Sequence, residues 1–449
     1  MKITIKNFGV IKHASIDTTR PINVFCGLNS TGKTYLTYLL YYIFSDDSYV
    51  GLDDYDSIIE KRESDNSLTF VYNRELLNKF LLFVGKKARK DLPVIFGISD
   101  DEADELFKDF SLKLFISEDE FRKQSKFSLK MKAFLNGYNF LFFFNSKEKV
   151  VKISKEDTKE ISNDDFKKIW NFLLCQAIRR LSCMPSAKSW MLTVERHAIY
   201  TFGKEVINSR SQFDDFYFSD DIYTLSEFGP RSYPLAIRRS LKYAKDIDNI
   251  KKTKGNYYDL AIALEKELLH GSLETSKSGS IELHLGNNVI LPIQVTSSLV
   301  KSLANLIICL KYQASFNDII LIDEPEMNLH PANQIFIARI FGELINKGLR
   351  LIISTHSDYI IRELNNLVML SNTSKEYQEG ISSMGYRTTM MIKPNMLGAY
   401  MFKYENDRVV VDKIDVTKEG FASLSIDDTI DALNENSESI YYAMKYGQQ

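Results

Sequence analysis

A glycine-rich segment near the start of the chain has the residue types and spacing of a phosphate-binding loop. Its eight residues, Gly27–Thr34, match the pattern G-x-x-x-x-G-K-[ST]. The two glycines let the backbone curl, so that its N–H groups and the N-terminus of the following helix face the phosphates of a nucleotide. We expect nucleotide contacts from six consecutive residues: Asn29, Ser30, Thr31, Gly32, Lys33 and Thr34.

Two side chains of this loop have specific roles in such a motif. Lys33 places a positive charge beside the β- and γ-phosphates, and Thr34 offers its hydroxyl to Mg²⁺. A chance glycine loop before a helix is the alternative interpretation. The β-rich run Ile22–Cys26 before the loop and the apolar helical stretch after it disfavour that alternative.

An acidic pair follows a second apolar run. Asp323 and Glu324 come directly after Ile319–Ile322, which places both carboxylates at the carboxyl edge of a sheet, where ligands bind. We expect Asp323 to hold magnesium through water. Glu324 is then the candidate general base that polarises the attacking water. An acidic pair after a strand is a weak signal alone, and the upstream phosphate loop strengthens it.

A histidine follows the next apolar run. His356 comes shortly after Leu351–Ile353, and at the end of a neighbouring strand it can contact the γ-phosphate or orient Glu324. A hydrogen-bonded core histidine is the alternative. The position beside the acidic pair favours the catalytic role.

These side chains require a particular set of supporting elements. The opening residues predict a strand, loop and helix, and the continuous apolar runs before Asp323 and His356 are typical of parallel strands covered on both faces. A helix is predicted over Ala332–Lys347 between those strands. We therefore expect an α/β fold, in which a P-loop ATPase core with a mixed sheet carries a largely helical insertion.

The predicted domain organisation places the two halves of the core at either side of the insertion. Residues 1–45 and 190–370 form the core, residues 46–189 form an α-rich insertion or lid with a hairpin around Tyr138–Ile153, and residues 371–449 form a C-terminal α/β tail. A AAA+ or helicase-like motor would have its acidic strand within about a hundred residues of the loop. Here about 290 residues separate Lys33 from Asp323, which disfavours a motor.

Longer segments around these residues resemble a known family. The segment Asp323–Pro331 is similar to D-E-P-E-x-x-L-H-P, and Thr355–Asp358 is similar to T-H-S-[DP]. These are motifs of ABC-type ATPases of the SMC and OLD (overcoming lysogenization defect) branch, especially the stand-alone ATPases of bacterial anti-phage systems such as Septu-like and PARIS-like ones. The resemblance covers roughly the first 45 residues and residues 190–365.

The resemblance implies a signature segment about twenty residues before the acidic strand. The segment Thr296–Leu303 resembles an S-S-G-x-x-[QK]-S-L form, in which Ser297 and Ser298 would bind the γ-phosphate held by the opposite subunit. Leu299 stands where a glycine is usual, which argues against fast turnover. The alternative is a serine-rich N-cap of a helix over Leu299–Tyr312.

A segment before the second half of the core also resembles the family. Val194–Arg196 is similar to an E-R segment that re-enters the nucleotide core. Arg196 could reach phosphate or a lid contact, or could form a structural ion pair.

Composition restricts the partners and the compartment. The 57 lysines and arginines nearly balance the 59 aspartates and glutamates, so the net charge of −2 gives no whole-molecule attraction to nucleic acid or to an anionic membrane. The four cysteines have no metal-ligand or redox spacing. Apolar runs are shorter than the ~20 residues of a membrane span. We expect a cytoplasmic protein without a membrane partner.

The expected cofactors are ATP and Mg²⁺, and the expected assembly is a homodimer of ABC cores or a higher homo-oligomer. The resemblance implies a sensor or scaffold subunit of an anti-phage defence complex that controls a separate effector, a nuclease, in response to nucleic acid or a phage-derived trigger. Only 93 residues follow His356, and they hold no convincing acidic set of a Toprim nuclease. The alternatives are a non-hydrolysing ATP-dependent scaffold and a nucleic-acid-binding ATPase of DNA-repair type.

Overall fold

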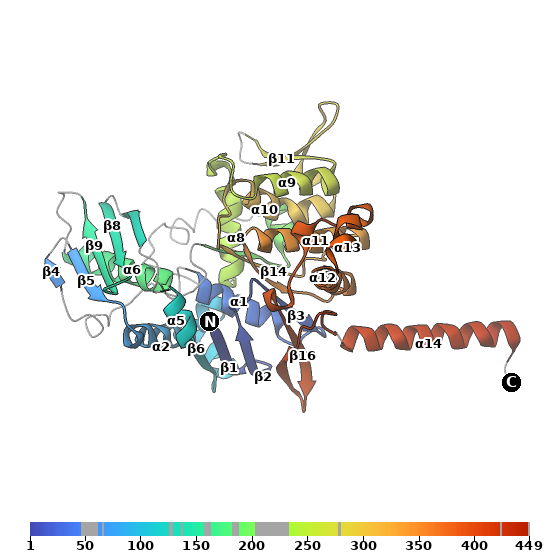
Figure 1. Cartoon of the computed structure of the whole chain (residues 1–449), viewed down its shortest axis with the longest axis horizontal. Helices are drawn as coiled ribbons and strands as arrows, with labels where there is room; N and C mark the ends of the chain where they lie inside the picture. The colour runs from blue at the N-terminus through green and yellow to red at the C-terminus, as the bar shows by residue number, and fades with distance from the viewer. Residues whose placement is uncertain are drawn as a thin grey trace.

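The computed structural model describes most of the chain as one α/β molecule (Figure 1). The described residues are 1–45, 62–64, 67–124, 129–135, 138–156, 163–181, 188–202, 233–276, 280–422 and 424–447. Parts of the predicted insertion, such as residues 46–61, and residues 203–232 of the predicted core lie outside these ranges.

The central sheet of the described residues has nine strands and is mixed, and the sequence predicts a mixed sheet. The order is β10-β14-β15-β3-β16-β17-β2-β1-β6. The run from β10 to β16 is parallel, whereas β16 pairs antiparallel with β17, and β1 pairs antiparallel with β2 and β6. The bounds are β1 (Lys2–Phe8), β2 (Ile11–Asp17), β3 (Ile22–Gly27), β6 (Ser111–Phe115), β10 (Ser189–Leu192), β14 (Ile319–Asp323), β15 (Arg350–Ser354), β16 (Leu397–Glu405) and β17 (Arg408–Ile414).

The two faces of this sheet are covered by two different hydrophobic cores. Ile320 and Ile322 of β14 face one core, and Ile319 and Leu321 face the other. This alternation explains the continuous apolar run, since a strand buried on both faces needs an apolar residue at every position. The helices α9 (Tyr258–Leu264), α10 (Ser298–Tyr312), α11 (Pro331–Asn346) and α12 (Asp358–Leu370) pack in one core, and α1 (Lys33–Phe44) packs in the other. Helix α8 (Leu235–Lys245) contributes residues to both cores.

The insertion is helical in part, as predicted, and it also contains a five-stranded sheet of order β4-β5-β9-β8-β7. Phe140, Phe142 and Phe144 are buried at alternate positions, which is the period of a strand. The strands β8 (Tyr138–Asn145) and β9 (Val150–Lys155) pair antiparallel across the predicted hairpin. The other elements are β4 (Arg62–Ser64), β5 (Ser67–Val71), α2 (Arg74–Lys90), α3 (Leu92–Phe96), α4 (Asp100–Leu106), α5 (Glu118–Gln124), β7 (Leu129–Leu135) and α6 (Asn163–Leu181).

The segment after residue 370 contributes to the central sheet. Strand β16 lies beside β3 in parallel register, so the sheet around the phosphate loop extends beyond the boundary expected at residue 370. Helix α14 (Leu424–Tyr446) leaves the body of the molecule (Figure 1). The remaining elements are β11 (Gly271–Thr275), β12 (Ile281–Leu285), β13 (Ile290–Pro292), α13 (Lys375–Gly380) and short 3-10 or π segments at 247–249, 265–269, 293–295, 381–384, 388–390 and 394–396.

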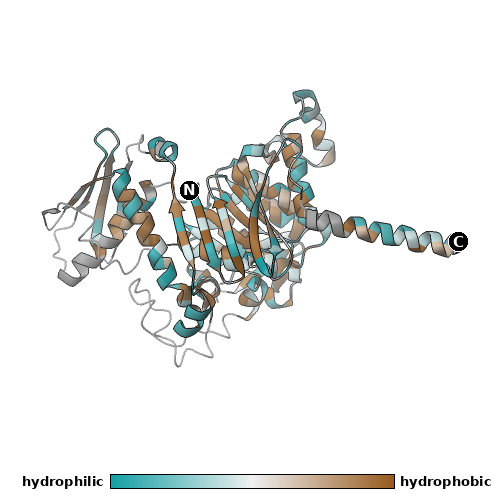
Figure 2. Cartoon of the chain, turned by 90° about the horizontal axis from the view of Figure 1, so that it is seen from below, coloured by the Kyte–Doolittle hydropathy of each residue, from teal (hydrophilic) through white to brown (hydrophobic). Residues whose placement is uncertain are grey.

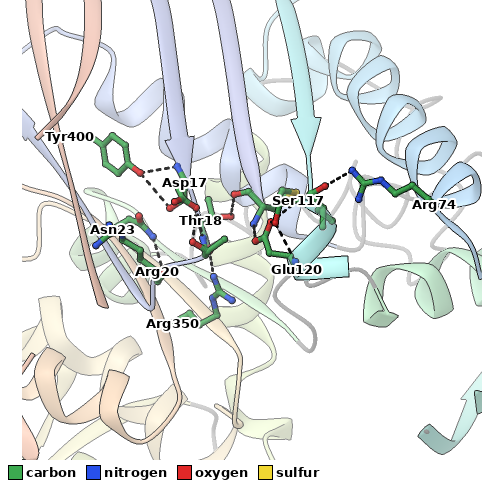
Figure 3. A network of polar contacts seen from close by, with 12 residues as sticks. Asp17, Thr18, Arg20, Asn23, Arg74, Ser117, Glu120, Arg350 and Tyr400 are labelled. Carbon is green, nitrogen blue, oxygen red and sulfur yellow. Dashed lines mark hydrogen bonds and ion pairs between the residues drawn. The ribbon is translucent and has the colours of Figure 1, made fainter. Parts of the chain in front are cut away.

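A polar network joins the first strands to the insertion and to β16 (Figure 3). The backbone nitrogen of Met1 lies 2.9 Å from Glu120 Oε1, and Thr18 Oγ1 donates to the Met1 carbonyl oxygen at 3.0 Å. On the other side, the Asp17 N–H donates to Tyr400 Oη at 2.8 Å. The start of β1 and the end of β2 are therefore fixed to the insertion on one side and to β16 on the other.

None of the helices among the described residues combines the length and the apolar composition needed to cross a membrane.

Candidate functional site

The phosphate loop connects β3 to α1 at the carboxyl edge of the parallel strands. Gly27 has φ +135° and a Cβ at this position would lie 2.3 Å from the Phe402 carbonyl oxygen, so no other residue fits beside β16. Gly32 has φ +85° immediately before α1. Thr31 Oγ1 donates to the Leu28 carbonyl oxygen at 2.8 Å and holds the curl. The predicted motif therefore has the backbone that phosphate binding requires.

The predicted loop residues divide into a solvent-facing and a buried set. Asn29 and Ser30 are exposed, whereas Thr31 and Lys33 are buried. Lys33 Nζ donates to the carbonyl oxygens of Gly27 and Leu28 at 3.0 and 2.6 Å. Burial lowers the pKa of Lys33 to about 8, against the opposing effect of Asp323. A phosphate beside this ammonium would favour its protonated form.

Asp323 and Thr34 meet at the start of α1. Thr34 Oγ1 donates to Asp323 Oδ2 at 2.8 Å, and Ser354 Oγ donates to Asp323 Oδ1. Burial raises the pKa of Asp323, and these two hydrogen bonds oppose the shift. A hydroxyl and a carboxylate oxygen side by side fit Mg²⁺, which prefers oxygen ligands and keeps several waters. Within the described ranges, no cluster of three or more His, Cys, Asp and Glu side chains has the arrangement of a metal site.

Glu324 follows with a rare backbone conformation. Its φ is +49°, in the left-handed region that non-glycine residues seldom adopt. Its N–H donates to the Ser354 carbonyl oxygen at 2.9 Å, which fixes the turn against the end of β15. Burial, and then the charge of Asp323, raises the pKa of the Glu324 carboxylate. A raised pKa makes the ionised carboxylate a stronger proton acceptor.

His356 lies between the phosphate loop and Glu324. Its Nε2 is 3.7 Å from Glu324 Oε1, and its ring is hydrogen-bonded to the backbone of Gly27. Burial, and then the charge of Lys33, lowers the pKa of His356 to about 4. The imidazole is therefore neutral at pH 7, and its approach to Glu324 is not an ion pair.

Glu326 positions this histidine and was not among the residues expected from the sequence. Glu326 Oε1 accepts from the His356 backbone N–H at 2.6 Å, and Oε2 accepts from Thr355 Oγ1 at 2.9 Å. The only signal in the sequence is the second glutamate of the D-E-P-E segment, whose partner could not be read from it.

Arg196 has a role that differs from both of its expected ones. It is 3% exposed and donates through Nη1 to the Asp323 carbonyl oxygen and through Nη2 to that of Glu324, each at 2.7 Å. Its Nε donates to the Ser302 carbonyl oxygen at 3.2 Å. Within the described part of the chain, its hydrogen bonds go to main-chain carbonyl oxygens and not to the phosphate loop or to a carboxylate. It fixes the acidic turn to helix α10.

Ser297 and Ser298 lie apart from this cluster. Ser297 is the N-cap of α10, and its Oγ accepts from the Val300 N–H at 3.4 Å, as the alternative interpretation predicts. Both serines are exposed, and within the described part of the chain they make no hydrogen bond to the phosphate loop. The structure therefore brings together Lys33, Thr34, Asp323, Glu324 and His356, and it leaves these two serines facing solvent.

A comparison with known protein families identifies the family to which the chain belongs. The family model described as AAA ATPase domain matches residues 1–361, and the chain belongs to this family. The phosphate loop, the acidic pair and His356 all lie within the matched residues. The protein is thus an ATPase-domain protein of the P-loop class. No curated protein matches the chain.

Solved SMC head structures align with the chain over most of their length. One is the SmcHead bound to the C-winged helix domain of ScpA, at 11% identity and TM-score 0.37, covering 92% of this chain and 98% of that one. The SMC head domain from Thermotoga maritima aligns at 10% identity and TM-score 0.33, with the same coverage. A third is the Smc head with an extended coiled coil bound to the C-terminal domain of ScpA from Pyrococcus furiosus, at 11% identity and TM-score 0.34, covering 97% and 98%.

Proposed function

We propose that the chain binds and hydrolyses ATP through an ABC-type site. One observation carries the proposal: Thr34, the adjacent Asp323 and Glu324, and His356 come from three distant points in the sequence and meet around Lys33 and the phosphate loop. The loop N–H groups and Lys33 would bind the β- and γ-phosphates. Thr34 and Asp323 would hold Mg²⁺, which would neutralise charge on the phosphates.

The remaining two side chains would act on the attacking water. Glu324 would accept its proton, because its carboxylate combines a raised pKa with a fixed backbone. The neutral His356 has a single ring N–H, which would donate to the γ-phosphate in place of the Gly27 backbone or would orient Glu324, since the ring lies between Gly27 and Glu324. Phosphate release from ATP by the purified protein tests this, with Lys33→Ala as the control. Equal release by both proteins would contradict the assignment.

The arrangement of the signature segment supports a head-to-tail pair of cores. Ser297 and Ser298 are exposed at the N-terminus of α10, and among the described residues they make no hydrogen bond to the phosphate loop of their own subunit. A second subunit would present its γ-phosphate to them. Sedimentation of the Glu324→Gln protein should then show a higher sedimentation coefficient with ATP than without it, because the two cores join. An unchanged sedimentation coefficient would contradict the shared site.

Leu299 supports a second candidate function, an ATP-dependent scaffold that does not hydrolyse. Leu299 is half-buried and packs against the core, where the resembling signature has a glycine that lets phosphate approach. Absence of turnover together with ATP-dependent association would favour this candidate. Stimulation of turnover by DNA would instead favour a nucleic-acid-binding ATPase of DNA-repair type.

We further propose that the ATPase is the sensor or scaffold of an anti-phage defence module with a separate nuclease effector. The support is the resemblance of Asp323–Pro331 and Thr355–Asp358 to the stand-alone defence ATPases. The homogeneous protein should then leave duplex DNA, single-stranded DNA and transfer RNA intact in the presence of ATP with Mg²⁺ or Mn²⁺. Nucleic-acid cleavage that co-purifies with the chain and is lost in Lys33→Ala would overturn the proposal that the effector is a separate protein.

A further inference from the structure

The C-terminal helix α14 is exposed to solvent over residues 431–446. It is 23 residues long, which corresponds to about 35 Å, and it extends away from the body of the molecule (Figure 1). Residues 431–447 are all exposed. A single helix is only marginally stable in water unless it packs against something. The exposure of α14 therefore raises the question of what it packs against.

One face of this helix carries an apolar stripe with the spacing of a coiled coil. Ile430, Leu433, Ser437, Ile440 and Met444 follow one another at alternating intervals of three and four residues, which are the a and d positions of a heptad. Leu433, Ile440 and Met444 are 65%, 69% and 77% exposed. Brown and teal residues alternate along the helix (Figure 2). Such a stripe is suited to a second helix with the same spacing.

The charges on α14 indicate which helix that is. The residues that flank the stripe are uncharged: Asn434, Asn436, Tyr441 and Ala443. Over the length of the stripe, from Ile430 to Met444, the acidic residues lie on the opposite side, at Asp431, Glu435 and Glu438, and Asp427 and Asp428 precede the stripe. Charged residues beside a stripe select or reject partners, and like charges there would repel an identical helix. Uncharged flanks therefore fit a second copy of α14.

We propose that α14 pairs with α14 of a second copy of this chain to form a two-helix coiled coil. Leucine and isoleucine fill the d positions, and Ser437 is a polar a-position residue that fixes the register. The pairing uses no nucleotide and does not depend on the proposed function. It would hold two ATPase cores at high local concentration and so favour their ATP-dependent contact.

Disulfide trapping tests the contact at one position. In the nucleotide-free full-length protein, Ser437→Cys should form a covalent dimer of twice 51.8 kDa under mild oxidation. Ser439→Cys changes an equally exposed serine two residues away on the opposite side of the helix, and it should cross-link far less. The wild type controls for the native cysteines. Equal cross-linking of Ser437→Cys and Ser439→Cys would overturn the proposal.

Sedimentation tests the pairing without a covalent bond. The nucleotide-free wild type should be a dimer at micromolar concentration, and the double variant Leu433→Asp/Ile440→Asp should be a monomer of 51.8 kDa. Tyr442→Asp places the same aspartate on the opposite side of the helix and should remain dimeric. A wild type that is monomeric without nucleotide, or that is dimeric with and without the double substitution, would overturn the proposal. Neither result would decide whether the proposed site hydrolyses ATP.

Discussion

At the scale of single residues, the central feature is the backbone of Glu324. The left-handed backbone conformation costs a non-glycine residue on the order of 1–3 kcal/mol, and it persists only when the surrounding structure fixes it. Here the Ser354 carbonyl oxygen accepts from its N–H, and its own carbonyl oxygen accepts from Arg196. The conformation directs the carboxylate towards His356. We infer that Arg196 is a positioning residue for the general base.

We predict that Arg196→Lys lowers kcat more than it weakens ATP binding. Lysine keeps the charge but lacks the planar fork that reaches the Asp323, Glu324 and Ser302 carbonyl oxygens together. A displacement of the base by about 1 Å lowers the rate on the order of 100-fold. Steady-state kinetics together with direct ATP binding separate the two effects. Equal loss of kcat and affinity would mean that Arg196 acts on nucleotide binding instead.

A second prediction concerns the pH dependence of ATP affinity. The pKa of Lys33 is lowered to about 8, so the ammonium loses its proton as the pH rises through that value. If only the protonated form binds, the apparent Kd rises roughly eightfold between pH 7.5 and pH 9. Binding of a fluorescent ATP analogue over this range measures it. Lys33→Ala should bind weakly and without this dependence, and a wild-type profile as flat as that of Lys33→Ala would contradict the role of Lys33.

At the scale of elements, the contact of β16 with the phosphate loop matters most. Gly27 and the Phe402 carbonyl oxygen lie so close that any Cβ would displace the strand. We predict that Gly27→Ala lowers the Tm by several degrees, because both the contact and φ +135° exclude alanine. Gly286→Ala is the matched control, since a Cβ there meets nothing within 4 Å. Thermal unfolding, followed by circular dichroism, gives the Tm of both variants. Equal Tm values for Gly27→Ala and Gly286→Ala would contradict the prediction.

The sequence predicts well those elements whose patterns are local. Ile319–Ile322 and Leu351–Ile353 are apolar at every position because both faces of their strands are buried, and they appear as β14 and β15. The interactions of Arg196 could not be predicted, because main-chain oxygens carry no sequence signature. The place of β16 was also not predicted, since its parallel pairing with β3 joins segments about 375 residues apart.

The full length of the C-terminal helix could also not be predicted from the sequence. Local patterns predict a helix over Ser425–Leu433, and α14 continues to Tyr446. The additional turns are rich in asparagine, serine and tyrosine, which are weak helix formers. The apolar stripe from Ile430 to Met444 is visible in the sequence, but its exposure becomes clear only from the structure.

At the scale of the whole molecule, two separate contacts between copies of the chain are expected. The proposed α14 pairing is independent of nucleotide, whereas the proposed core pairing needs ATP between the phosphate loop and Ser297 and Ser298. The Leu433→Asp/Ile440→Asp protein separates the two contacts. It should be monomeric without ATP, and the same protein carrying Glu324→Gln as a third substitution should still self-associate when ATP is present. ATP hydrolysis per site should fall at low protein concentration in the double variant, since the tether is lost.

The central assignment for this molecule is that Glu324 is the general base at a site that binds ATP through Lys33. A single-turnover measurement with limiting radiolabelled ATP and Mg²⁺ tests it directly. We predict that the wild type converts bound ATP to ADP, that Glu324→Gln binds ATP and retains it at least 100-fold longer, and that Lys33→Ala binds little ATP, because glutamine keeps the shape of Glu324 and loses the proton acceptor. Conversion of ATP by Glu324→Gln at the wild-type rate would contradict the account.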